Sequence, residues 1–230
     1  MLPDTIKTRG LHAGIRFAPL GVLDKQHKQQ FQAKANEGFD WQRQEYAENL
    51  WRLTTPQPGG GPRSHLKLTL QPDAFNFEDS FPADPIDLFS DNLKLGLDVL
   101  AAVFSPKLII GVGIVVRLAA QSDPPDAREY LGNRCLKLDD KLAPLGRPVH
   151  GVGLKLLLPP LPREGATNWQ AIVKVESLVE DVRQLYIEVD ARWANPFQWN
   201  PQSVVDCVKT THDFATTQVA DFLHNLGKAF

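Results

Sequence analysis

The order of strand-like and helix-like patterns constrains this sequence most, because one order, β-α-β-β-β-α, occurs twice. Side chains alternate between the two faces of a strand, and Ala13, Ile15 and Phe17 alternate in this way. The first half then continues with a helix at 23–39, strands at 50–54, at 66–70 and from 75, and a helix opened by Asp84-Pro85. The second half has a strand at 108–120, a helix at 126–145, strands at 149–157, 171–175 and 187–193, and a helix opened by Asn200-Pro201.

Loops rich in proline and glycine fall at the same place in each half, at 56–62 and at 159–165. This punctuation places the boundary between the units after residue 105, giving units 1–105 and 106–230 fused into one domain. A sheet that is apolar on one face needs helices to cover that face. We therefore predict an α+β fold with one continuous antiparallel sheet of about eight strands and helices mainly on one face.

The face of the sheet that the helices leave open can be predicted from the alternation of each strand. Seven cations from seven strands share this face: Arg16, Arg52, Lys67, Arg117, Lys155, Lys174 and Arg192. The same alternation places acidic residues there as well: Glu78, Glu176, Glu188 and Asp190. One interpretation is a mildly basic platform for a partner. The other is an ordinary solvent-exposed face, on which lysine and arginine are common.

Glycines share the predicted open face: Gly14, Gly111, Gly113, Gly151 and Gly153. Glycine inside a strand marks a bend or a place where another molecule approaches the backbone closely. Gly111-Val112-Gly113 and Gly151-Val152-Gly153 lie inside strands and not at a strand-to-helix turn, which excludes a dinucleotide-binding loop.

Motifs for catalysis or metal binding are absent from the sequence. It contains no GxSxG, HExxH or P-loop pattern, and its six histidines are scattered. Cys135 and Cys207 lie far apart, which predicts two apolar thiols without a disulfide. We therefore predict no catalytic residues, no metal site and no cofactor.

Charge and hydropathy indicate a cytoplasmic protein without a membrane span. The net charge is −2, so the overall charge attracts neither nucleic acid nor anionic lipid strongly. The first residues lack the apolar core of a signal peptide. The longest apolar run, 108–120, contains Arg117 and is too short to cross a bilayer.

The duplicated order of elements resembles the layout of TATA-binding-protein-like folds, whose saddle-shaped sheets bind DNA or other partners. The strand 110–117 and the final helix around Thr211-His212, with Phe222 downstream, are similar to a sporadically distributed group of uncharacterised bacterial proteins. Thr211 departs from the leucine expected there, and the opening strand lacks the group's proline–apolar–glutamate start. The resemblance implies a bacterial protein that acts beside other proteins.

These observations favour a non-enzymatic binding or accessory protein that uses the open sheet face for a protein partner. Nucleic-acid binding across the seven cations is the first alternative. The second is a small-ligand binder or an enzyme with a pocket between the sheet and the long helices, which a charged group at a buried position such as Asp206 or His212 would favour. A homodimer is a further expectation, with the edge strands and the leucines at 156–158 pairing across a two-fold axis.

Overall fold

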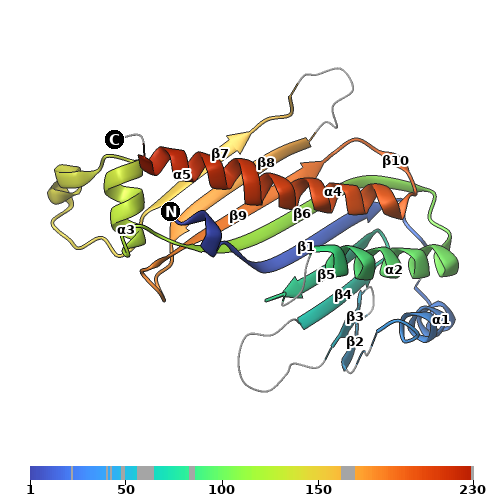
Figure 1. Cartoon of the computed structure of the whole chain (residues 1–230). Helices are drawn as coiled ribbons and strands as arrows, with labels where there is room; N and C mark the ends of the chain where they lie inside the picture. The colour runs from blue at the N-terminus through green and yellow to red at the C-terminus, as the bar shows by residue number, and fades with distance from the viewer. Residues whose placement is uncertain are drawn as a thin grey trace.

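A computed structural model of the chain describes residues 1–21, 23–39, 41, 43–47, 50–55, 65–82, 86–161 and 169–228. Within these residues the protein is α+β, with a ten-stranded antiparallel sheet and helices packed on it (Figure 1). The predicted fold class is therefore confirmed.

The strands pair in the order β2-β3-β4-β5-β1-β6-β9-β8-β7, and the short β10 also pairs with β6. Their bounds are β1 Lys7–Phe17, β2 Arg43–Ala47, β3 Leu50–Thr54, β4 His65–Gln71, β5 Ala74–Ser80, β6 Leu108–Gln121, β7 Gly153–Leu158, β8 Trp169–Ser177, β9 Gln184–Trp193 and β10 Phe197–Gln198. The two longest, β1 and β6, pair at the centre. Outward from them, the first half of the chain contributes β5, β4 and β3, and the second half contributes β9, β8 and β7.

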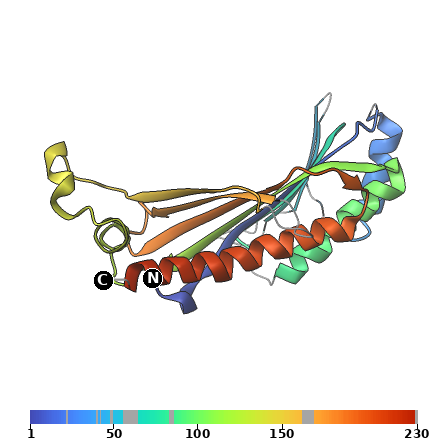
Figure 2. The ribbon, with the colours of Figure 1, turned by 90° about the horizontal axis from the view of Figure 1, so that it is seen from above.

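The long helices lie on one side of this sheet, and within the described residues the other side carries no helix (Figure 2). The helical segments are α1 Lys25–Ala35, α2 Ile86–Phe104, α3 Ala127–Glu129, α4 Pro201–Phe214 and α5 Ala220–Lys228, with π turns at Tyr130–Cys135 and Ala215–Val219 and 3-10 turns at Pro3–Thr5 and Asp139–Leu145. Asn200 caps α4 by accepting a hydrogen bond from the backbone N–H of Gln202. In the described part of the chain, no helix has the length and hydropathy to cross a membrane.

The core lies between the helices and the apolar face of the sheet. Ala13, Ile15 and Phe17 of β1 are buried, as their alternation predicts. On the helix side, Leu93 and Leu97 of α2 are fully buried. Gly96 lets α2 approach the sheet closely, because a Cβ there would lie 3.0 Å from the Phe75 ring. The free thiols of Cys135 and Cys207 are buried as well, as predicted.

Two local features differ from the prediction. The strand β2 is not among the predicted strands. The range 126–145 is not one helix but the short α3, a π turn and a 3-10 turn.

Some expectations fall outside the described residues. They concern the loop 56–62, the helix start at Asp84-Pro85 and the part of the loop 159–165 that follows Leu161.

Candidate functional site: the helix-free face of the sheet

The structure places all seven predicted cations on the helix-free face. Arg16, for example, lies between the buried Ile15 and Phe17 of β1. The remaining six lie one to a strand on β3, β4, β6, β7, β8 and β9. Their distribution on one face thus follows from the period of two in every strand.

These cations do not form a free basic surface, because six of the seven are paired with carboxylates. The pairs and their N–O distances are Arg16–Asp73 2.6 Å, Arg52–Glu45 2.9 Å, Lys67–Glu78 2.7 Å, Arg117–Glu188 3.1 Å, Lys174–Glu188 2.7 Å and Arg192–Asp190 2.8 Å. Lys155 on β7 has no carboxylate partner among the described residues, and Lys174 is its cross-strand neighbour. The face is therefore close to charge-balanced.

Glu188 on β9 is the centre of the largest group of these contacts. Its carboxylate accepts hydrogen bonds from Arg117 Nε, Lys174 Nζ and Tyr186 Oη. Burial alone would raise the pKa of Glu188, but the hydrogen bonds from Lys174, Arg117 and Tyr186 outweigh it and lower that pKa. Burial, together with the negative charge of Glu188, raises the pKa of Tyr186 to about 12. The group joins β6, β8 and β9 across the open face.

A second paired group lies on the other half of the sheet. Lys67 of β4 donates to Glu78 of β5, and Glu78 lies directly across from His12 of β1. Burial opposes the negative charge of Glu78, yet the contact with Lys67 lowers its pKa. Burial lowers the pKa of His12, which keeps this imidazole neutral at pH 7.

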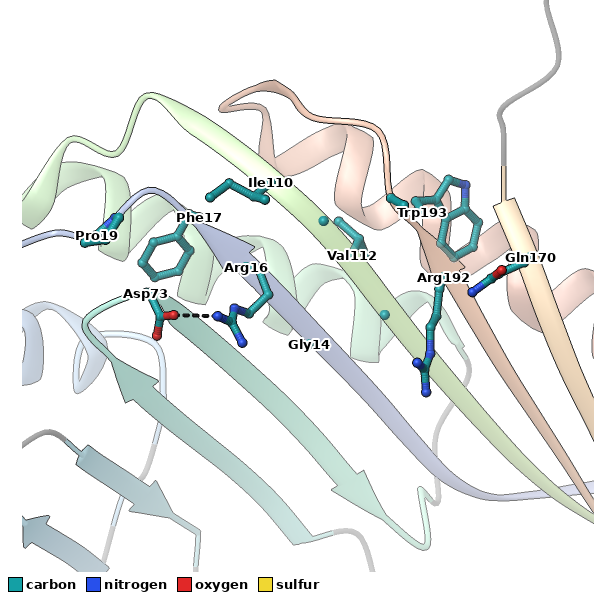
Figure 3. Close-up of a pocket in the computed structure, with 13 residues that line it drawn as sticks. Gly14, Arg16, Phe17, Pro19, Asp73, Ile110, Val112, Gln170, Arg192 and Trp193 are labelled. Atoms are coloured by element: carbon teal, nitrogen blue, oxygen red, sulfur yellow. Dashed lines mark hydrogen bonds and ion pairs between the residues drawn. The ribbon is translucent and has the colours of Figure 1, made fainter. Parts of the chain in front are cut away.

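Beyond these two groups along the strands, the face is hollowed over β1, β6 and β9, toward the carboxyl end of β1 (Figure 3). The hollow has a volume of about 610 Å³. Gly14 of β1 pairs directly with Gly113 of β6, and Gly111 lies beside Arg16. Arg16 and Arg192 lie on either side of this glycine floor, and Gln170 of β8 adds an amide (Figure 3). Ile110, which is 44% exposed, adds an apolar wall.

The glycines make the hollow, because side chains at these positions would occupy it. A Cβ at Gly113 would meet no atom closer than the Gly14 carbonyl oxygen at 3.9 Å, so the space above Gly113 is open. A Cβ at Gly14 would lie 3.1 Å from Asn76 Oδ1, and one at Gly111 would lie 3.3 Å from the Trp193 carbonyl oxygen. A bound group can thus contact the backbone of β6 directly at Gly113.

The sequence identified the glycines and the two arginines of this hollow but missed the other residues that line it. Asp73 is in the β4–β5 turn, and Ile110 faces outward because the register of β1 and β6 shifts between Arg16 and Phe17. A register shift leaves no mark in residue spacing. The acidic residues that the sequence predicts on this face could have indicated that its cations form ion pairs.

The described residues hold no group of three or more histidines, cysteines or carboxylates that could bind a metal ion. Of the two positions named as signs of a helix-side pocket, Asp206 is exposed and bonds to Gln202, and His212 is half-buried beside Asp213. Burial lowers the pKa of His212.

Comparison with protein-family models, curated proteins and solved structures found no match to this chain.

Proposed function

We propose that this chain is a non-catalytic binding protein that holds a protein partner on its helix-free sheet face. The observation that carries the proposal is the hollow of about 610 Å³ over the strands β1, β6 and β9 of that face. It is floored by backbone and flanked by Arg16, Arg192 and Gln170, so it suits one anchoring side chain of a partner. An anchoring side chain that a partner buries in a pocket can supply a large share of the binding energy of a protein interface.

The ion pairs favour a protein partner over nucleic acid. Affinity for nucleic acid comes from cations that replace the counterions of the phosphates. Here six of the seven cations already neutralise carboxylates of the same face. A face of alternating charges with an apolar hollow complements another protein surface better than it complements a polyanion.

The test is site-specific photo-crosslinking in cells that produce the protein. A photoreactive residue replaces Gln170, which is exposed at the hollow, and in the matched control it replaces Gln218, which is exposed on the helix side. We expect a protein adduct from position 170 and none of the same mass from position 218. The adduct should be lost when Gly113→Leu fills the hollow, and it should persist with Gly151→Leu, which adds the same side chain outside it.

Two results would count against the proposal. An adduct that nuclease treatment removes would indicate nucleic acid as the partner. An adduct that persists unchanged in the Gly113→Leu variant would show that binding does not depend on the hollow. Circular dichroism of the purified variants verifies that each has kept its fold.

A further inference from the structure

The two edges of the sheet differ in how they are protected against pairing. Among the described residues, β2 ends the sheet at one edge and β7 at the other. The β2 edge carries Arg43, Glu45 and Tyr46, and Arg43 and Glu45 form an ion pair. Such charged edges resist pairing with another chain.

The β7 edge lacks this protection, because its sequence is Gly153-Leu-Lys-Leu-Leu-Leu158. Its single charge is Lys155, and no proline interrupts it. Leu157 is 69% exposed, and Leu161 just beyond the strand is 64% exposed. An exposed apolar edge of this kind is a template for strand addition.

The free backbone groups of β7 follow from its pairing with β8. The N–H of Ser177 donates to the carbonyl of Val152. The N–H of Leu178 points the other way and donates to the carbonyl of Gln184 in β9. In antiparallel sheets hydrogen-bonded pairs alternate with non-bonded ones. The register therefore directs the backbone of Leu154, Leu156 and Leu158 toward β8. The N–H and C=O groups of Gly153, Lys155 and Leu157 point outward.

We propose that β7 binds the β7 strand of a second copy of this chain, antiparallel across a two-fold axis. Only residues with outward backbone groups can form the hydrogen-bonded pairs. Two registers then overlap best. One places Lys155 opposite Lys155 of the other copy, and like charges directly opposite are destabilising. The other places Lys155 opposite Leu157 and Leu156 opposite Leu156 at the axis.

The second register also covers the apolar surface of the edge. Each Leu157 would pack against the aliphatic stem of the other copy's Lys155 on the helix-free face. On the helix side, each Leu154 would lie opposite Leu158. The contact is self-complementary, as a two-fold interface requires. It would join the two sheets, and with them the two helix-free faces, into one surface.

The test is sedimentation equilibrium of the full chain as purified. We expect a dimer for the wild type. Leu157→Lys should raise the dimer dissociation constant by at least about tenfold, because the introduced ammonium group would face the other copy's Lys155 twice in each dimer. The double variant Lys155→Glu with Leu157→Lys should restore the dimer, since opposite charges then face each other. Leu145→Lys, at a leucine that is 62% exposed away from this edge, is the matched control and should leave the dimer intact.

Disulfide trapping tests the register. Leu156→Cys should cross-link to itself under mild oxidation, because the two-fold axis brings the two Cβ atoms together in a non-hydrogen-bonded pair. Lys155→Cys should cross-link poorly. The buried Cys135 and Cys207 do not compete. A wild-type monomer, or a dimer that Leu157→Lys leaves unchanged, would overturn the proposal. This test is independent of the hollow, so its failure leaves the proposed function standing.

Discussion

Replacing Glu188 with glutamine is the sharpest test of how the charges on the helix-free face contribute to stability. The carboxylate of Glu188 is 14% exposed and accepts hydrogen bonds from Arg117, Lys174 and Tyr186. Glutamine keeps the shape but loses the charge. Its amide oxygen can serve one cation, and its NH₂ group would face the other.

The expected loss of stability follows from these contacts. A hydrogen bond to a charged group contributes about 1.5–3 kcal/mol. The two cations are each more than a third exposed, so solvent screens part of their interaction. Two lost bonds at the low end of that range would amount to about 3 kcal/mol. Because solvent screens both cations, we expect Glu188→Gln to lower the free energy of unfolding by about 2 kcal/mol. For a chain of this size that corresponds to a fall in Tm of about 4–8 °C.

Urea unfolding followed by circular dichroism measures this difference at pH 7. The matched control is Glu45→Gln, which removes a carboxylate from the more exposed pairs with Arg43 and Arg52. Surface pairs of this kind contribute about 0–1 kcal/mol. If both variants lost the same small amount, the Glu188 group would contribute no more than an exposed ion pair, and the argument from burial would be refuted.

The difference in the free energy of unfolding between wild type and Glu188→Gln should also become smaller as the pH falls. The pKa of Glu188 is lower in the folded chain than its ordinary value of 4.5. A carboxyl with a lowered folded pKa contributes stability above its unfolded pKa and loses it as the pH falls through the folded pKa. The difference in the free energy of unfolding should therefore be largest at pH 7 and disappear at acidic pH. A difference in the free energy of unfolding that increases below pH 4 would contradict the lowered pKa of Glu188.

Three further predictions concern the core and the termini of helices. Leu93→Ala in the buried face of α2 should cost about 2–5 kcal/mol in urea unfolding, and Leu88→Ala, at an exposed position of the same helix, should cost less than about 1 kcal/mol. Burial raises the pKa of Cys207 to about 12, so a thiol reagent at pH 8 should leave it unmodified in the native chain and react in urea. Arg128 holds the pKa of Asp126, the cap of α3, at about 2, so the stability difference between wild type and Asp126→Asn should persist to pH 4 and vanish toward pH 2.

The fold was predictable where the period of the pattern was clear. In β8, Ala171, Val173 and Val175 alternate strictly, and all three are buried. The strand β2 has no such pattern, since Arg43–Ala47 contains one aromatic residue among polar neighbours, and it owes its conformation to pairing with β3. The range 126–145 has helical spacing in its leucines. Its helix breaks because Lys137 and Asp139 adopt positive φ angles and Pro144 follows.

The candidate site was predictable as a face and not as a set of contacts. Alternation within each strand fixes which side a residue lies on, so the seven cations could be assigned to the helix-free face. Which carboxylate each cation meets depends on the register between strands that are distant in sequence, and Arg117 and Glu188 are 71 residues apart. The hollow depends in addition on a register shift between β1 and β6. Both are properties of the whole sheet and not of any segment.

The pairing of β1 with β6 at the centre of the sheet has a consequence for synthesis on the ribosome. Lys7 pairs with Ala119 and Phe17 pairs with Ile109, so β1 stays without one of its neighbours until the second half has begun to emerge. The strands β3, β4, β5 and β1 can assemble earlier, but their inner edge then remains open during translation. Contacts between such distant residues slow folding, because the intervening chain must close into a loop first. A chaperone that shields an apolar strand edge would therefore help this protein most while only the first half of the chain has been synthesised.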